Sequence, residues 1–335
     1  MQLQQLDYLP DGLLSAPAEQ LHAILHRPTL IHLPGKQSKP LYLSVLLHGN
    51  EPTGLIAVQA LLHKYQAQQL PRAVSIFFGN TLAAEQGVRR LNLQPDFNRV
   101  WPGTELPESP ESRMAAEIVA IMQQQNPFAS IDIHNNTGHN PHYACINKLE
   151  NSYLQLACLF GRLIVYFIRP KGVQSAAFAE FCPAVTLECG RPGQQNGIEH
   201  ALDFLDTCLH LREIPQAPVA SKNIDLFHTV AQVSVKDQID LSFNRPSADL
   251  YLNEDLEWMN FTEIPPGTAL GKVKNGMALP LLVKDERGQD ISSKFFSINE
   301  QELQINRATM PSMLTLDEKI IKQDCLCYLM ERIQL

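Results

Sequence analysis

The sequence lacks several features that would each point to a different class of protein. It contains no run of about 18 apolar residues, which argues against a membrane-spanning helix. Its 27 basic and 35 acidic residues give a net charge of −8, so a broad basic surface for nucleic acid is not expected. The N-terminal MQLQQLDYLPDG lacks the basic start and apolar stretch of a secretion signal. We therefore expect a cytoplasmic protein that binds neither nucleic acid nor a membrane.

Paired cysteine motifs are also absent. The chain has 7 cysteines, an odd number, and none of them forms a C-x-x-C pair. This pattern argues against a disulfide framework and against a zinc site made of thiolates. Buried, reduced thiols are the expected form.

What the sequence does contain is an alternation of apolar strand-like runs and amphipathic helical segments. Such alternation predicts an α/β fold in which a mostly parallel sheet is covered by helices on both faces. A polar connection rich in proline, residues 80–109, interrupts the pattern, and a stretch of that length is usually functional. The expected strands are 41–47, 73–78, 129–134, 163–168 and 184–188, and the expected helices are 52–68, 111–124, 152–162 and 197–212.

The pattern changes after Pro215 and Pro218, which mark a linker. Short β-like runs separated by turn residues follow it, and they predict a smaller β-rich domain. The expected domains are therefore 1–215 and 216–335. The β-like runs are 226–235, 248–252, 268–273, 279–284 and 325–330.

The first candidate for chemistry is the segment LLHGNEPTG, in which His48 and Glu51 are three residues apart just beyond an apolar strand. A turn of that length can bring an imidazole and a carboxylate onto one zinc ion. The spacing alone is weak, because His210 and Glu213 repeat it at the polar end of a helix. There a basic side chain is ordinary helix chemistry.

The second candidate is IDIHNNTGHNPHY. His134 ends an apolar strand, and Asp132 lies two residues earlier on the same side, where it could orient the imidazole by accepting its other ring proton. A strand-end histidine bonded to a loop carbonyl is the alternative. His139 and His142 follow in a polar loop, where surface or pocket-lining positions are expected.

Two further segments supply a carboxylate and arginines. Glu188 ends the strand AVTLE and is either paired in a salt bridge or poised to take up a proton. The neighbours Asn98 and Arg99 lie in the long polar connection, after Arg89 and Arg90. Arginine binds carboxylates through a planar fork, so arginines near a metal suggest an acidic substrate. The alternative is a surface loop with scattered arginines.

These signals gain weight from a shared position. His48, His134 and Glu188 each lie at or just past the carboxyl end of an expected parallel strand, which is the edge where open α/β sheets place their ligand sites. The Asn98–Arg99 connection leaves a strand at the same edge. We therefore expect these side chains to converge.

The motifs HGNE, DFNR, DIHNNT and LECG, in this order, resemble the succinylglutamate desuccinylase/aspartoacylase family of zinc carboxypeptidase-like hydrolases. The resemblance implies a zinc hydrolase catalytic domain followed by a β-rich C-terminal domain. It implies one Zn²⁺ per chain, held by His48, Glu51 and His134, with Glu188 as general base. It also implies that Asn98 and Arg99 hold a substrate carboxylate.

The same resemblance implies an arginine that polarises the scissile carbonyl. Arg90 is the expected residue, although its distance from the Asn-Arg pair is one residue longer than in aspartoacylase, which leaves Arg89 open. A second departure is that no arginine lies about ten residues before Glu188, where aspartoacylase binds its substrate. Arg169 or Lys171 would have to substitute.

The activity implied by the resemblance is cleavage of the amide bond of a small acidic N-acyl amino acid. A metallocarboxypeptidase or peptide amidase is the first alternative, because an Asn-Arg pair can also hold a peptide C-terminus. A non-catalytic zinc- or ligand-binding protein is the second. The sequence leaves homo-oligomer formation open.

Overall fold

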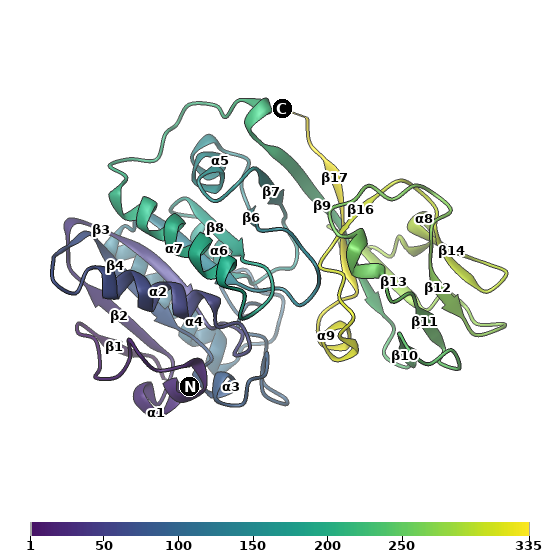
Figure 1. The fold of residues 1–335 in the computed structure, drawn as a ribbon, viewed down its shortest axis with the longest axis horizontal. Coiled ribbons are helices and arrows are strands. Elements are labelled where there is room, and N and C mark those ends of the chain that lie inside the picture. The colour runs from purple at the N-terminus through teal and green to yellow at the C-terminus, as the bar shows by residue number, and fades with distance from the viewer. Residues whose placement is uncertain (1, 335) are drawn as a thin grey trace. The chain divides into compact units, whose positions relative to one another are not determined.

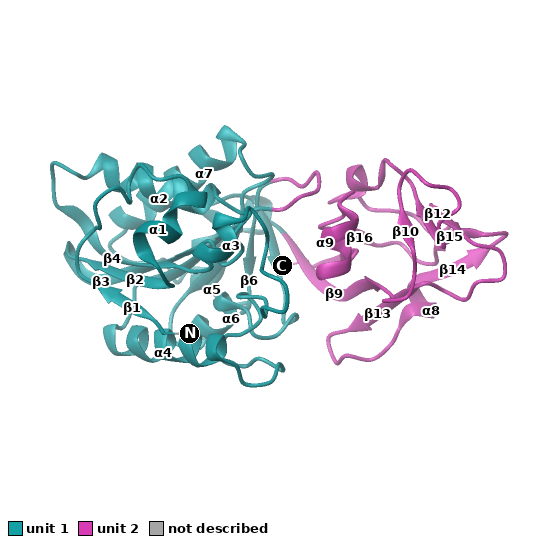
Figure 2. Ribbon diagram, turned by 90° about the horizontal axis from the view of Figure 1, so that it is seen from below, with its two compact units in different colours: residues 1–135, 142–225 teal, residues 136–141, 226–335 magenta. Residues whose placement is uncertain are grey.

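A computed structural model describes residues 2–334 and divides the chain into two units. Unit 1 consists of Met1–Asn135 and His142–Asp225, and unit 2 consists of Asn136–Pro141 and Leu226–Leu335 (Figure 2). The short segment 136–141 is thus the only part of the first 225 residues that belongs to unit 2.

Unit 1 is a mixed α/β fold around one large sheet (Figure 1). Its strands are β1 (Gln4–Leu6), β2 (Thr29–Leu33), β3 (Gly35–Val45), β4 (Leu70–Phe78), β5 (Ala129–His134), β6 (Tyr143–Ile146), β7 (Leu163–Tyr166) and β8 (Ala184–Glu188). Its helices are η1 (Ala18–Gln20), α1 (Leu21–Leu25), α2 (Thr53–Lys64), α3 (Thr81–Glu85), α4 (Pro110–Gln125), α5 (Asn151–Cys158), α6 (Gln174–Phe178), α7 (Gln195–His210) and η2 (Ser221–Asn223).

The strand order in unit 1 is β1-β2-β4-β3-β5-β8-β6-β7. The central strands β4, β3, β5 and β8 run parallel to one another, whereas β2 pairs antiparallel with β4, and β6 antiparallel with β8. The carboxyl ends of β3, β5 and β8 therefore meet at one edge of the sheet. This edge carries the candidate site.

Burial on both faces explains why the central strands are apolar throughout. All six residues of β5 and all five of β8 are buried, as is the carboxyl half of β3. Helices α2 and α7 lie on one side of the sheet and α4 lies on the other (Figure 2). No helix within residues 2–334 is long and apolar enough to cross a membrane.

Local sequence signals fix several helix boundaries. Ser109 and Ser112 form a reciprocal capping box at the start of α4, with Pro110 in the first turn. The helix ends at Asn126, whose backbone is left-handed with a φ of 48°. Its apolar stripe, which includes Met114 and Ile118, faces inward.

The structure contains several short elements that were not expected, among them the strands β1, β2 and β6 and the helix α6. The antiparallel strands β2 (TLIHL) and β6 (YACI) were not expected, because each is only four or five residues long and lies beside a polar loop. Helix α5 ends at Cys158, four residues before the expected end at Arg162. The connection 80–109 contains one short helix, α3.

Unit 2 consists mainly of strands. A five-stranded sheet has the order β10-β11-β12-β15-β14, and in a second set β13 and β17 pair with β9 while β16 pairs with β17. The strands are β9 (Asp225–Val235), β10 (Leu241–Ser242), β11 (Leu250–Leu252), β12 (Ala269–Val273), β13 (Leu281–Asp285), β14 (Phe296–Asn299), β15 (Glu302–Ile305), β16 (Met310–Ser312) and β17 (Cys327–Arg332). The helices are η3 (Leu256–Met259), α8 (Ser292–Phe295) and α9 (Glu318–Gln323).

Hydrogen bonds within unit 2 hold the segment 136–141. The buried side chain of Asn260 donates to the carbonyls of His139 (3.2 Å) and Leu314 (2.9 Å), and its oxygen accepts from the amide of Leu314. The side chain of Asn140 accepts from the amide of Met313 at 3.0 Å. The segment that follows the last residues of β5 is therefore fixed by contacts to the C-terminal part of the chain.

Candidate metal centre

The loop between β3 and α2 brings His48 and Glu51 to the carboxyl edge of the sheet. Gly49 is required there by close packing, since a Cβ on this residue would lie 2.2 Å from the backbone nitrogen of Ala84 in α3. Leu46, which begins the loop, has a φ of 56°, and its carbonyl accepts a hydrogen bond from the amide of Asn80. The loop is thus held in a specific conformation against α3.

Two imidazoles converge on the carboxylate of Glu51. The Nδ1 atom of His48 lies 2.8 Å from one oxygen of Glu51, and the Nδ1 atom of His134 lies 2.7 Å from the other. His48, Glu51 and His134 each offer one ligand atom, and these three atoms all lie within 4.8 Å of one another. All three side chains are buried. The convergence expected from the sequence is therefore present.

A second carboxylate stands behind each imidazole. The Nε2 atom of His48 lies 2.9 Å from Asp96, and the Nε2 atom of His134 lies 2.8 Å from Asp132. Asp132 is fully buried and also accepts a hydrogen bond of 2.6 Å from the hydroxyl of Ser44. With a metal bound, each carboxylate would accept the Nε2 proton of its histidine, and Nδ1 would then be the atom that binds the metal.

The charges in this cluster shift the pKa values of its members. Burial alone would raise the pKa of Glu51, but the neighbouring His48 and His134 hold it well below the ordinary value. Burial likewise opposes ionisation of Asp96, yet Arg89 and His48 keep its pKa well below the ordinary range. Burial would lower the pKa of His134, whereas the charges of Asp132 and Glu51 raise it well above the ordinary value. Glu51 and Asp96 are therefore ionised.

The donor set fits a divalent metal ion. Two neutral imidazole nitrogens and one carboxylate oxygen are the ligands of many catalytic zinc sites, which keep a further position for water. The carboxylates of Glu51 and Asp132 are buried, Asp96 is partly buried, and the guanidinium of Arg89 contacts both Glu51 and Asp96. A cation at the centre would interact favourably with these carboxylates.

Glu188 lies beside His134 on the neighbouring strand. The two residues are directly paired in the parallel register of β5 and β8, so their side chains project from the same face of the sheet. Glu188 is 5% exposed, and its negative charge contributes to raising the pKa of the Cys189 thiol, after burial itself. The carboxylate is therefore buried next to the proposed ligands.

The two adjacent arginines occupy different places. The guanidinium of Arg89 donates to Asp96 at 2.9 Å and lies 3.6 Å from Glu51. Arg90, which the sequence favoured for a role at the scissile bond, instead donates to the backbone carbonyl of Gln94 at 2.7 Å. Of the two, Arg89 is the one in contact with the ligand cluster.

Asn98 and Arg99 both lie at this centre. The amide oxygen of Asn98 accepts from the backbone of Gln174 at 2.8 Å, and its nitrogen lies 3.3 Å from Asp132 and 3.1 Å from Nε2 of His134. The amide group of Asn98 is therefore in contact with the histidine and the carboxylate behind it. Arg99 donates to the carbonyl of Asn98 at 2.8 Å and is only partly buried.

The remaining candidates lie elsewhere in their units. Within unit 2, His139 packs against the exposed ring of Trp258 with 4.1 Å between ring centroids. Within unit 1, the Nδ1 atoms of His142 and His200 are 2.9 Å apart. Arg169, considered as a substitute substrate-binding residue, makes a bidentate ion pair with Glu105 at 2.7 and 2.8 Å.

Comparison with known proteins places this geometry in a family. Residues 37–212 match the family described as the succinylglutamate desuccinylase/aspartoacylase catalytic domain. The match covers more than half of the 335 residues and includes every proposed ligand. The chain belongs to this family.

Solved structures of proteins named for the same family share the fold. A succinylglutamate desuccinylase from Chromobacterium violaceum matches with a TM-score of 0.57 and 20% identity, over 89% of this chain and 86% of the other. One from Vibrio parahaemolyticus matches with a TM-score of 0.61 and 12% identity, over 96% and 97%. Murine aminoacylase 3 matches with a TM-score of 0.54 and 14% identity, over 90% and 97%. No curated protein sequence matches the chain.

Two contacts of the ligand histidines and their carboxylates, both within the segment that matches the desuccinylase/aspartoacylase family, were not predicted from the sequence. Asp96 opens the DFNR motif, yet its bond to His48 joins residues 48 positions apart, and no spacing rule predicts it. Ser44 lies on β3 and reaches Asp132 across the β3–β5 register, which is visible only when the strands are paired. In both cases the signal was a polar residue in or beside an otherwise apolar segment.

Proposed function

We propose that this chain is a zinc-dependent hydrolase that cleaves the amide bond of a small acidic N-acyl amino acid. One observation carries the proposal: two buried histidines, each backed by a carboxylate, direct Nδ1 at the same glutamate within the segment matched by the family. We infer further that the fold is the zinc carboxypeptidase-like form, with the catalytic machinery in residues 1–215.

His48, Glu51 and His134 would hold the zinc ion. When bound, zinc supplies Lewis acidity, which lowers the pKa of a coordinated water to about 7 and polarises a carbonyl oxygen. Asp96 and Asp132 keep the two imidazoles in the orientation that presents Nδ1. The proteins in the matched structures are named as desuccinylases or an aminoacylase, which supports an acyl-amino acid rather than a peptide as substrate.

Proton transfer is assigned to Glu188. Its carboxylate accepts the proton of the attacking water and then delivers it to the nitrogen of the leaving amine, so that one group serves both steps. Its place beside His134 in the register supports this role. Arg89 contacts the ligand cluster and would stabilise negative charge on the carbonyl oxygen, a contribution of about 3 kcal/mol for one donor. Arg90, bonded to Gln94, is the weaker candidate for that role.

An acidic substrate would be held by Arg99 together with Asn98. Arg99 is the less buried of the two and offers a planar fork that matches a carboxylate. Asn98 contributes mainly by placing Arg99 and by bonding Asp132. The residues that would bind the acidic group of the substrate thus lie in the connection 80–109, just after Asp96.

The decisive experiment is an assay of the zinc-loaded protein on a panel of N-acetyl and N-succinyl amino acids, with dipeptides as competitors. We expect hydrolysis of acyl-amino acids with acidic groups and about one zinc per chain by mass spectrometry. The variant His48→Ala should lose both. The matched control is His210→Ala, because His210 and Glu213 repeat the spacing of His48 and Glu51 away from the centre.

Two outcomes would contradict the proposal. Cleavage of dipeptides alone would indicate a carboxypeptidase or peptide amidase. Zinc below about a tenth of an equivalent after metal-replete purification would indicate that the cluster is not a metal site.

A further inference from the structure

The amino-terminal end of the same sheet carries a second feature that the proposed reaction does not use. A cavity of about 650 Å³ opens where β3 begins and α7 ends. Its lining includes the basic residues Lys36, Lys39, Arg72 and Arg212, and one acidic residue, Glu213. A cavity of this size is in the range of small-molecule sites.

Arg72 is the buried anchor of this cavity. It is 2% exposed, and its guanidinium donates to the carbonyls of Lys39 (3.0 Å) and Leu211 (2.7 Å) and to the side chain of Gln37 (2.6 Å). The ring of Phe128 lies 3.6 Å from its central carbon. All of these partners are neutral, and within residues 2–334 no carboxylate lies within 4.0 Å of it.

The bland interpretation is that Arg72 caps the end of α7. Leu211 follows the last residue of that helix, where backbone carbonyls carry about half a negative charge. This interpretation accounts for the position of Arg72. The helix end carries only about half a negative charge, however, so it does not fully neutralise the guanidinium. It also leaves the other three cations of the cavity unexplained.

Those three cations are exposed and form no ion pair in the described part of the chain. Lys36 and Lys39 lie on the first residues of β3, and Arg212 lies just past α7. By contrast, Arg113, Arg162 and Arg245 on the surface each pair with a carboxylate. In a chain of net charge −8, four cations and one acid around one cavity form a local positive site.

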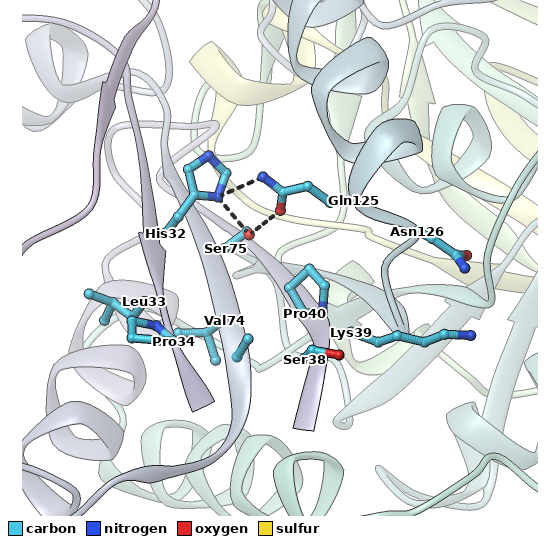
Figure 3. Close-up of a pocket in the computed structure, with 11 residues that line it drawn as sticks. His32, Leu33, Pro34, Ser38, Lys39, Pro40, Val74, Ser75, Gln125 and Asn126 are labelled. Atoms are coloured by element: carbon cyan, nitrogen blue, oxygen red, sulfur yellow. Dashed lines mark hydrogen bonds between the residues drawn. The ribbon is translucent and has the colours of Figure 1, made fainter. Parts of the chain in front are cut away.

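The neighbouring cavity lacks this property. It has a volume of about 580 Å³ and shares Ser38 and Lys39 with the first (Figure 3). Three of its polar groups bond one another, because Ser75 links His32 (2.8 Å) to Gln125 (3.1 Å). The positive charge is therefore concentrated on the side of Lys39 that carries Arg72.

We propose that the cavity lined by Lys36, Lys39, Arg72 and Arg212 binds a small organic anion with two negative charges, of the phosphate-ester or dicarboxylate class. Apolar walls from Phe128, Pro183 and Ile214 would contact its carbon skeleton. Val45 is six residues beyond Lys39 on β3, so about 20 Å of strand lies between this cavity and the loop of the metal centre. An anion bound here does not take part in the reaction.

The test is calorimetric titration with phenyl phosphate and with phthalate, which carry an aromatic ring and two negative charges and bind zinc weakly. Phenol and benzoate serve as controls for the ring and for a single charge. We expect binding of at least one dianion, and the stronger of the two identifies its class. The triple variant Lys36→Gln, Lys39→Gln, Arg212→Gln should weaken it by about tenfold or more, since three favourable charge contacts are lost.

A matched control removes the same charge elsewhere in unit 1, as Arg27→Gln, Arg113→Gln, Lys148→Gln. Binding should be unchanged in this variant and in metal-free protein. Equal weakening in both triple variants would show a general charge effect and overturn the proposal. Undiminished binding in the first variant would place the anion elsewhere, and absence of binding to the unaltered protein would also overturn it. All readouts are independent of catalysis, so failure of the proposed hydrolase activity would not affect them.

Discussion

The two ends of strand β3 carry charged residues in opposite arrangements. At its carboxyl end most of the charged groups are buried and contact one another, and His48 and Glu51 lie in a cluster of imidazoles and carboxylates. At its amino end Lys36 and Lys39 are exposed without ion pairs beside the buried Arg72. The first end is prepared for a cation and the second for an anion, although one continuous strand connects them.

The difference shows what burial does to an ionisable group. Buried charges that are matched by neighbours keep fixed protonation states and positions, which is what chemistry at a metal requires. Exposed and unmatched charges remain mobile and screened by solvent, which suits reversible binding. Substitutions at the carboxyl end should therefore change catalysis and metal binding, whereas those at the amino end should leave both intact.

The largest effect is expected for Glu188→Gln. This change keeps the shape of the side chain but removes the group that accepts a proton, so kcat should fall about 10³-fold while the bound metal is retained. Steady-state kinetics combined with metal analysis measures both. Glu180→Gln, at an exposed glutamate outside the site, should be indistinguishable from the unaltered protein. Near-normal turnover by the Glu188 variant would remove this residue from the mechanism.

A smaller effect is expected at the carboxylates behind the histidines. Asp132→Asn and Asp96→Asn each retain a hydrogen-bonding group but lose the charge that orients an imidazole. Metal affinity should fall by about 10- to 100-fold. Competition with a chromogenic chelator gives the affinity, and Asp203→Asn at the exposed face of α7 is the control. Unchanged affinity in both variants would mean that the carboxylates do not support the ligands.

The pH dependence of metal binding sharpens the same comparison. In the metal-free protein the pKa of His134 is raised by Asp132 and Glu51, against the effect of burial, so His134 is protonated at neutral pH. A metal must displace that proton from Nδ1, and affinity should therefore rise about tenfold per pH unit until the raised pKa is reached. The pKa of Glu51 is lowered, so this carboxylate adds no proton over the same range. Chelator competition between about pH 7 and pH 8 would reveal a flat profile if the pKa of His134 were ordinary.

The sequence predicted the carboxyl end of the sheet better than the rest, for a physical reason. Strands buried on both faces, such as β5 (Ala129–His134) and β8 (Ala184–Glu188), are continuously apolar, so both were located to the residue. Polar residues that end such strands are costly unless they have a role. His134 and Glu188 were therefore visible as candidates from one sequence, and the structure places them side by side.

Contacts that depend on the path of a loop could not be predicted in this way. Arg89 and Arg90 are adjacent, and only the conformation of the connection that follows decides which one reaches Glu51. The spacing of His48 and Glu51 recurs in His210 and Glu213, yet His210 bonds the carbonyl of Asp206 within its own helix. Spacing alone does not separate a ligand pair from ordinary helix chemistry.

The amino end of the sheet gave no sequence signal, because its basic residues come from three separate segments. Lys36 and Lys39 precede the apolar part of β3, Arg72 is the third residue of β4, and Arg212 follows α7. Each is ordinary in its own context. Only strand pairing brings them together, as in the parallel register of Gln37 with Arg72.

The smallest catalytic effect is expected for Arg72→Met, which tests whether the two ends are independent. Methionine fills part of the volume but leaves the carbonyls of Lys39 and Leu211 without their donor. Loss of these bonds to a charged group should lower the free energy of unfolding by about 3 kcal/mol. Denaturant unfolding measures this cost, with Arg113→Met at an exposed ion pair as the control. Because about 20 Å of β4 lies between Arg72 and Phe78, which is at the carboxyl edge of the sheet, kcat and metal affinity should stay within about twofold. A folded Arg72 variant with strongly reduced kcat would show that the strand couples its two ends.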